Sequence, residues 1–296
     1  MQQYPLVQRY TTLKRAINLY SAFAFTALCL FLHTELFAQY YYKDLLTLEQ
    51  NRKKRELFRK EKVHRVKVVS TDTEGRTIPG FSSEQEANRD HSLITTRTTT
   101  DLSGNSINST YFNSEGLPIR SSDSSGDVNT IVEYRYELGR PSAILSTTFS
   151  SGLAMASEQH QWIYNGKGIP VKMLLIKNET DTTVVDFMAD EKGLIIEEKI
   201  HSKGKATREY YYYYDEMGHV TDIVRFNDMA RRLLPDYIFE YEASGQVGSM
   251  LMVPEDTRSY QQWYYSYDED GLKILDACYS KEKTLIAKLE YTYTYF

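Results

Sequence analysis

Glycines recur at nearly regular intervals in the second half of this chain. From Gly139 to Gly271 the successive spacings are 29, 25, 25, 27 and 26 residues, with the intervening glycines at 168, 193, 218 and 245. A period in this range indicates an array of structural repeats. One such unit is too long for a single strand but suits two strands of about eight or nine residues with their connections.

One copy of the unit reads clearly as a β-hairpin. Five consecutive tyrosines, Tyr210–Tyr214, favour a pleated strand over a helix. Asp215–Gly218 then predicts a tight turn, because glycine adopts the positive φ that such turns need and aspartate bonds to its own backbone. The segment Val220–Phe226 is the returning strand.

The same pattern of strand, turn and glycine extends from Val63 to the C-terminus. Its further turns are expected at Asp72–Gly75, Ser114–Gly116, Leu138–Gly139, Gly166–Gly168, Asp190–Gly193, Ser244–Gly245 and Glu269–Gly271. Residues 80–92 lack a strand pattern and are interpreted as an insertion. The predicted fold is mainly β: a large antiparallel up-and-down meander of about 25-residue hairpin repeats, roughly sixteen strands in all. We expect the sheet to be curled or closed into a barrel-like form, with one N-terminal helix.

The strands alternate between two kinds of side chain. Val132, Tyr134 and Tyr136 share one face, whereas Glu133 and Arg135 share the other. One face of the sheet is therefore aromatic and apolar, and the other is mostly charged. A flat meander of this size would expose a very large apolar surface. The sheet must curl on itself, close into a barrel, or lie against a membrane.

The first 38 residues have the features of a secretory signal peptide. Arg9, Lys14 and Arg15 precede an apolar run from Ala16 to Leu32, and Ala38 offers a cleavage point before Gln39. The run is near the short limit of the roughly 17–25 residues that span a bilayer, so we predict cleavage rather than an anchor helix. The mature protein is then exported to the periplasm or the extracellular space.

Cleavage would leave a single cysteine, Cys278, and hence no intramolecular disulfide. The alternative of a lipid anchor on Cys29 is disfavoured, because the apolar run continues past that residue.

Residues 39–62 form a basic N-terminal segment ahead of the β-repeat domain at 63–296. Residues 39–70 hold 10 Lys+Arg and 4 Asp+Glu, a net charge of +6, whereas residues 71–296 hold 22 and 35, a net charge of −13. We predict a helix over about 43–60 that docks on its own acidic chain, where it covers an edge or end of the sheet. The alternative is a plug or a partner-binding arm. Export makes nucleic acid an improbable partner for this basic stretch.

The motif Tyr-x-Tyr-Asp-x-x-Gly-x-x-Thr at Tyr212–Thr221, and in part at Tyr265–Gly271, resembles the YD repeat of Rhs-type proteins. The signal peptide followed by a chain of hairpins also resembles Gram-negative envelope proteins of unknown function with a porin-like fold. Together these resemblances imply a large β-sheet outside the cytoplasm. They bring no catalytic residues to this chain, and no toxin-like domain follows the repeats.

Local motifs for chemistry are absent from the sequence. The six histidines form no pair at metal-ligand spacing, and no nucleophile elbow, phosphate loop or dinucleotide fingerprint occurs. Asp268–Gly271 lacks the later glutamate of a calcium loop. We therefore expect no catalytic residues, no metal, no cofactor and no enzyme activity, although a site assembled from distant strands would leave no such motif.

The favoured hypothesis is a non-enzymatic binding or scaffolding protein of the cell envelope, with an envelope polysaccharide or a protein as partner. Aromatic rings on a rigid sheet can stack on sugars or peptides, although the same rings can equally form the core. The candidate ligand-binding residues are Trp162, Tyr212, Tyr214, Trp263, Tyr265 and Tyr267. The alternative is a porin-like outer-membrane β-barrel with membrane association, and the third hypothesis is an enzyme without a recognisable motif.

Overall fold

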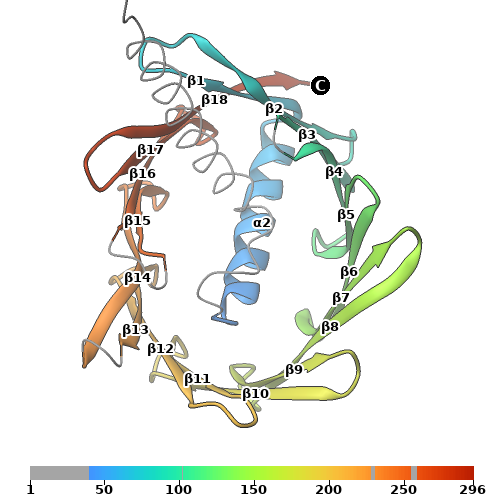
Figure 1. Ribbon diagram of the computed structural model, residues 1–296, viewed down its shortest axis with the longest axis vertical. Helices are drawn as coiled ribbons and strands as arrows, with labels where there is room; N and C mark the ends of the chain where they lie inside the picture. The colour runs from blue at the N-terminus through green and yellow to red at the C-terminus, as the bar shows by residue number, and fades with distance from the viewer. Residues whose placement is uncertain (1–39, 102, 228–230, 255–258) are drawn as a thin grey trace, which may run out of the picture.

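The computed structural model describes residues 40–101, 103–227, 231–254 and 259–296 (Figure 1). The predicted signal peptide at 1–38 lies outside the described residues. The described part contains one helix, α2 (Lys43–Lys60), and eighteen strands. The strands are β1 (Val63–Thr71), β2 (Thr77–Ala87), β3 (Leu93–Thr100), β4 (Gly104–Phe112), β5 (Pro118–Ser125), β6 (Val128–Glu137), β7 (Arg140–Ser150), β8 (Leu153–Tyr164), β9 (Pro170–Lys177), β10 (Asp181–Ala189), β11 (Ile195–His201), β12 (Arg208–Tyr214), β13 (Val220–Asn227), β14 (Arg232–Tyr241), β15 (Val247–Met252), β16 (Gln261–Tyr267), β17 (Lys273–Ser280) and β18 (Leu285–Tyr295).

The sheet closes on itself. Every strand pairs antiparallel with the next one along the chain, and β18 returns to pair with β1, with Val66 opposite Tyr293 and Ser70 opposite Leu289. The result is a ring of strands with α2 inside its outline (Figure 1). Closure removes the free edges that an open meander would expose. The predicted antiparallel meander of hairpins is confirmed, and the sheet is closed into a barrel.

The turns repeat one hydrogen-bonding pattern. At Asp215–Gly218 the Gly218 N–H donates to the Asp215 carbonyl (3.1 Å), and the Asp215 N–H donates to the His219 carbonyl (3.0 Å). Gly218 has a φ of +83°, which favours glycine. The same pair of backbone bonds closes the turns Asp72–Gly75, Asn113–Gly116, Asn165–Gly168, Asp190–Gly193, Glu242–Gly245 and Asp268–Gly271. The predicted placement of the repeat glycines at chain reversals is therefore confirmed.

At six places in the described chain, a tyrosine hydroxyl near the end of a strand bonds to the preceding hairpin. The Tyr267 hydroxyl, one residue before the Asp268 turn, donates to the carbonyl of Val247, the first residue of β15 (2.9 Å). Equivalent bonds of 2.6 to 2.8 Å run from Tyr136 to Pro118, Tyr164 to Pro141, Tyr214 to Ile195, Tyr241 to Val220 and Tyr293 to Lys273. Each acceptor lies 18 to 23 residues upstream of its donor. The repeat tyrosine thus links successive units, a role that the sequence pattern did not reveal.

The helix α2 crosses the ring instead of covering an edge. Together with residues 40–42 it forms a segment that we term the strut (residues 40–60). Its N-terminal end contacts β8 and β10–β14, and its C-terminal end contacts β4 and β18. The expectation of a helix over an edge or end of the sheet was wrong, because a closed sheet has no edge to cover. The alternative of a plug describes the position better.

Contacts with the strut identify the inner face of the barrel. Glu198 on β11 and Tyr210 on β12 both touch the strut, so their side chains point inward. Because side chains alternate along a strand, Glu197 and Lys199 point outward. The outer face is crossed by ion pairs such as Lys199–Glu197 (3.1 Å). Others are Lys199–Glu209, Lys172–Asp186, Arg65–Glu84 and Arg97–Glu86.

The inner wall has two unlike halves. From β9 to β18 it is apolar and aromatic, with buried clusters around Met173 and Trp263. From β2 to β8 it is rich in hydroxyl and amide side chains that bond across neighbouring strands. These bonds include Ser83–Thr98 (3.1 Å), Gln85–Thr96 (3.0 Å), Asn108–Asp123 (3.3 Å) and Thr130–Thr148 (3.1 Å). The polar half contains one small apolar cluster, formed by Ala87, Ile94 and Phe112 of β2, β3 and β4.

The polar half also explains two errors of prediction. Residues 80–92 were expected to be an insertion, but residues 77–87 form β2. The expected number of strands was roughly sixteen, and the structure has eighteen in its described part. Strands β3 and β5 carry mostly serine, threonine and charged residues, and residues 82–86 of β2 are all polar. Because neither of their faces is apolar, they lack the alternation that marks a strand in sequence.

We predict that Tyr267→Phe lowers the free energy of unfolding by about 1 kcal/mol, because the Val247 carbonyl loses its hydroxyl donor. The matched control is Tyr264→Phe. That tyrosine is on the same strand but is 50% exposed, so its loss of a hydroxyl should change stability by less than about 0.5 kcal/mol. Urea unfolding of the two variants measures the difference. Equal stability of the two would show that the repeat tyrosine bond is not stabilising.

Candidate functional site

The N-terminal end of the strut is held by a buried carboxylate. Glu198 is fully buried. Its Oε1 accepts a hydrogen bond from the Tyr41 N–H (2.7 Å), and its Oε2 accepts bonds from the Tyr42 N–H (3.0 Å) and the Tyr212 hydroxyl (2.7 Å). Burial raises the pKa of Glu198 to about 7, in spite of these three donors. The first backbone amides of the strut are therefore satisfied by the barrel wall.

A histidine holds the next residues of the strut. His160 on β8 lies between two carboxylates, with its Nδ1 at the Asp44 carboxylate and its Nε2 2.8 Å from Glu158. Burial lowers the pKa of His160, but the two carboxylates outweigh burial and raise it to about 9. Glu158 also pairs with Lys177 (3.0 Å). Burial would raise the pKa of Glu158, but His160 and Lys177 lower it to about 2.

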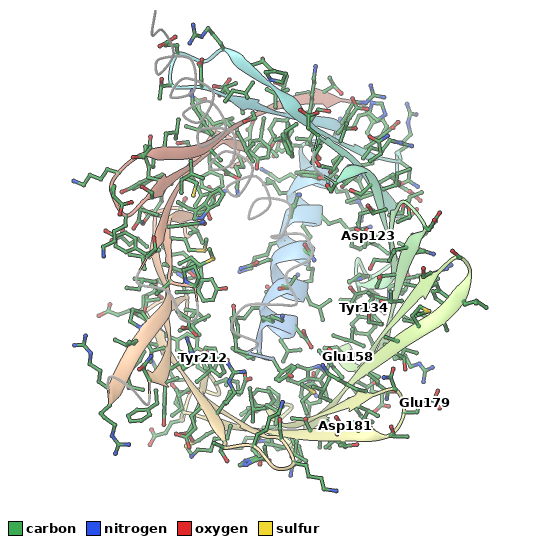
Figure 2. All side chains as sticks on the ribbon, viewed as in Figure 1. Asp123, Tyr134, Glu158, Glu179, Asp181 and Tyr212 are labelled. Carbon is green, nitrogen blue, oxygen red and sulfur yellow. The ribbon has the colours of Figure 1, made fainter. Side chains whose placement is uncertain are left out.

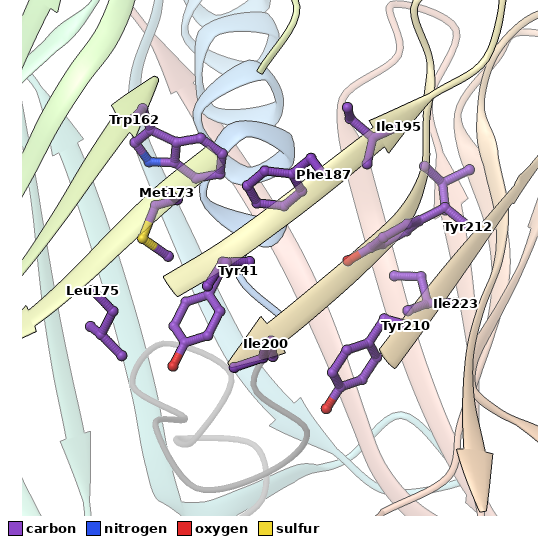
Figure 3. Packing of buried hydrophobic residues seen from close by; sticks show 12 residues of the cluster. Tyr41, Trp162, Met173, Leu175, Phe187, Ile195, Ile200, Tyr210, Tyr212 and Ile223 are labelled. Carbon is purple, nitrogen blue, oxygen red and sulfur yellow. The ribbon is translucent and has the colours of Figure 1, made fainter. Parts of the chain in front are cut away.

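Aromatic rings surround these polar contacts. The Tyr40 ring lies 5.9 to 6.1 Å from the rings of Tyr210, Tyr212 and Tyr237, and the Tyr42 ring meets Tyr212 edge-on at 5.2 Å. Figure 3 shows Tyr41 among the wall residues of this cluster. Such edge-to-face contacts add to the stability that burial provides. This end of the strut is the best-packed part of the barrel interior.

The C-terminal end of the strut has a second anchor. The Arg55 Nε donates to the His91 carbonyl (2.7 Å), and its guanidinium lies 5.2 Å from the centre of the Phe112 ring. Phe58 is buried against Tyr293, with ring centres 6.3 Å apart. The strut is thus fixed to the wall at both ends.

Between its anchors the strut is exposed on one side. Gln50, Asn51 and Lys53 are exposed and lie within one half of the helix surface. On the opposite side Leu48 and Arg52 are half-buried and Arg55 is buried. One side of the middle of the helix is therefore open to solvent inside the ring. Figure 2 shows Tyr212 and Glu158 on the walls to either side of the N-terminal end of α2. The barrel interior is accessible along the centre of the strut.

The six candidate ligand-binding residues do not form one site. Trp162 (4% exposed) and Tyr212 (2% exposed) lie in the cluster beneath the strut, where Trp162 stacks on Phe187 at 5.2 Å. The hydroxyl of Tyr214 is used by the bond between hairpins.

The other three candidates lie across the ring in a second cluster or beside it. Trp263 is buried there with Met250 and Cys278. Tyr265 is half-buried, with the Lys273 ammonium 4.4 Å from its ring centre, and Tyr267 makes the bond to Val247. A ligand-binding role for these six residues stays a prediction.

Sequence reasoning missed Glu198, His160 and Arg55. One signal was present for Glu198, because alternation places it on the same strand face as buried Ile200. A charged residue on an apolar face requires a partner. No local pattern marked the partners, since Tyr41 and Glu198 are 157 residues apart.

Among the described residues, no group of three or more His, Cys, Asp or Glu side chains is arranged to hold a metal ion. Cys278 is buried, and burial raises the pKa of its thiol to about 12. In residues 40–296, apart from the undescribed gaps, no helix is long and apolar enough to cross a membrane.

Comparison with known proteins gives matches in structure but not in sequence. No family model and no curated protein matches this chain. It is similar to a porin-like protein from Bacteroides uniformis, with 6% identity, a TM-score of 0.38, and coverage of 79% of this chain and 97% of that one. A porin-like protein from Bacteroides vulgatus matches with 10% identity, a TM-score of 0.28, and coverage of 78% and 98%.

The Photorhabdus luminescens Tc holotoxin pore is also similar, with 13% identity and a TM-score of 0.29. The match covers 76% of this chain but 15% of that chain. Both resemblances expected from the sequence, to porin-like proteins and to Rhs-type shells, are thus found among solved structures. All three TM-scores are below 0.5, so these matches assign no function to this chain.

We predict that Glu198→Ala frees the N-terminal end of the strut, because it leaves two backbone amides and the Tyr212 hydroxyl without their acceptor. Each unsatisfied buried donor costs about 1–3 kcal/mol. Hydrogen exchange at the Tyr41 and Tyr42 amides should accelerate at least tenfold, with exchange in β4–β6 unchanged. Glu197→Ala removes the adjacent outward carboxylate and should leave these amides protected. Protection that persists in Glu198→Ala would refute the anchor.

We expect stability to fall as pH rises from about 6.5 to about 9. The pKa of His160 is about 9 in the folded protein and near 6.5 when unfolded, so its contribution is complete below pH 6.5 and lost through pH 9. The raised pKa of Glu198 acts in the same direction between about pH 4.5 and 7. The free energies of unfolding from urea titrations at pH 6.5 and 9.5 should differ by on the order of 1–3 kcal/mol. His160→Gln should flatten this dependence, and an unchanged slope in that variant would exclude His160 as its source.

Proposed function

We propose that this chain is a non-enzymatic binding or scaffolding protein of the cell envelope, located in the periplasm or outside the cell. The proposal rests mainly on one observation. Both ends of the strut are fixed to the wall of the closed ring, and the middle of the strut is exposed. A helix needed only to fill the barrel would be buried along its length. Here solvent reaches the helix and the inner wall, which therefore form a preorganised surface for a ligand.

Two acid–base groups that contact the strut support a structural role over catalysis. Glu198 and His160 have shifted pKa values, which often mark functional sites. Both side chains are nevertheless bonded to the strut, and Glu198 is fully buried. Neither group has a free position at which a substrate could be protonated or deprotonated. Their chemistry is used to fix the strut.

The inner wall offers two kinds of contact to an extended polymer. The β2–β8 half presents hydroxyl and amide groups, such as Thr96 and Asn108, that can bond to a polysaccharide or a peptide backbone. The opposite half presents half-buried rings, including Tyr265. Sugars and peptides are both bound by such combinations of stacking and hydrogen bonding. We propose an envelope polysaccharide or an extended protein segment as the partner.

The alternative function is a porin-like outer-membrane barrel. Outward ion pairs weigh against it, because lysine or arginine facing lipid at the bilayer midplane costs roughly 2–4 kcal/mol. On β11 the outward side chains are Glu197, Lys199 and His201, none of them apolar. On β3 the outward row contains Thr95, Arg97 and Thr99. A lipid-facing barrel needs a continuous apolar band, and these strands interrupt it.

We predict that the full chain, expressed with its own leader in a Gram-negative host, is extracted from the envelope by carbonate without detergent. The extracted protein should then co-sediment with insoluble envelope polysaccharide or with envelope proteins. Heat-dependent gel mobility of a species that only detergent extracts would support the outer-membrane barrel instead. Extraction without retention of any polymer or protein would refute the binding role. A known outer-membrane barrel of the host serves as the control for extraction.

A further inference from the structure

A small open pocket lies where the C-terminal end of the strut meets the barrel wall. Its volume is about 400 Å³. It is lined by Arg55, Glu56, Arg59 and Lys60 of α2 and by Ser114 and Glu115 of the turn between β4 and β5. It is distant in sequence and structure from the Glu198 anchor. None of the six candidate ligand-binding residues lines it.

Arg55 is a buried cation without a carboxylate partner among the described residues. It is 5% exposed, and its Nε donates to the His91 carbonyl. Its two terminal nitrogens donate to no acceptor within the part of the chain that the structure describes. A Cβ added to Gly116 would lie 2.6 Å from Arg55 Nη1, so the turn leaves room for this guanidinium. A buried charge normally requires a counter-charge.

The other acidic groups near Arg55 are engaged elsewhere or stand apart. Glu56 pairs with Arg52 (2.6 Å). The Asp90 carboxylate accepts bonds from the backbone and the hydroxyl of Ser92 (3.1 and 2.8 Å). Glu115 lies at the mouth of the pocket, and no ion pair joins it to Arg55 or Arg59 among the described residues. The Arg55 charge is therefore not neutralised by direct contact.

Arg59 adds a second cation to the same pocket. It is exposed, and within the described ranges it makes no ion pair. The Lys60 ammonium pairs with the Glu61 carboxylate at 2.6 Å, so Lys60 contributes less positive charge to the pocket. Burial and the positive charge of Arg59 lower the pKa of Arg55, whereas the charges of Asp90 and Glu56 raise it. An anion between the two guanidinium groups would offset the repulsion between their charges.

We propose that this pocket binds an oxyanion, held between the guanidinium groups of Arg55 and Arg59. The planar fork of arginine donates two parallel hydrogen bonds to a carboxylate or phosphate, and the Ser114 hydroxyl lies in the same pocket. The group is either free phosphate or the carboxylate of an acidic sugar, which share this chemistry. The inference does not depend on the proposed function. It requires only that a dissolved anion can reach this pocket.

The test is calorimetric titration of the full mature protein, in low-salt Hepes buffer, with inorganic phosphate and separately with sodium glucuronate. Glucose is the neutral control. Saturable binding of at least one anion is expected, together with a rise in the melting temperature. Arg59→Gln should weaken binding at least fivefold and leave the melting temperature without ligand unchanged. Lys53→Gln removes a charge from the same helix outside the pocket and should bind as the parent protein does.

Each outcome decides the proposal. Binding of phosphate alone assigns the free ion, binding of glucuronate alone assigns an acidic sugar, and binding of both supports a general oxyanion site. Absence of saturable binding by either anion overturns the site. Equal weakening in Arg59→Gln and Lys53→Gln also overturns it, since this would show non-specific charge attraction. Arg55→Lys, which keeps the charge but loses the fork, should also weaken binding.

Discussion

Antiparallel pairing of every strand with the next, closed by β1 with β18, is the interaction on which the ring depends. Ladder bonds join the neighbouring strands along their length. At six places in the described chain a tyrosine hydroxyl adds a side-chain bond between two paired strands, as Tyr241 of β14 does to Val220 of β13. Donor and acceptor are 18 to 23 residues apart in each case, so these bonds recur along the array of hairpins.

The strut is a second constraint on the shape of the ring, because both of its ends are bonded to the wall. Its N-terminal anchor places a carboxylate, two backbone amides and a tyrosine hydroxyl in a site without solvent, where each group needs the others. Its C-terminal anchor uses Arg55 and Phe58. Between them the helix makes its own ion pairs, including Arg52 with Glu49 (2.8 Å). These internal pairs let the middle of the helix stay folded in solvent without packing against the wall.

Prediction from sequence succeeded where one strand face is apolar and failed where neither is. Strands β6 and β18 alternate tyrosine with polar residues, and the turns at Gly218, Gly245 and Gly271 were placed correctly. The strand Thr77–Ala87 was missed, since its inward residues Ser83 and Gln85 bond to threonines across the sheet instead of entering a core. Among the site residues, the aromatic ones were noticed by composition. Glu198 and Arg55 were not, since what distinguishes them is burial beside distant backbone groups.

The sequence by itself determined the hairpin unit, its turn chemistry and the separation of an aromatic face from a charged face. These are local properties, because positive φ at glycine and alternation along a strand depend on near neighbours. Closure of the ring, the passage of α2 through it and the Glu198 and Arg55 anchors were decided only by the tertiary structure. Each of them joins residues far apart in the chain, such as Val66 with Tyr293 and Tyr41 with Glu198. No local pattern encodes such a contact, since its free energy exists only once the whole sheet has curved and closed.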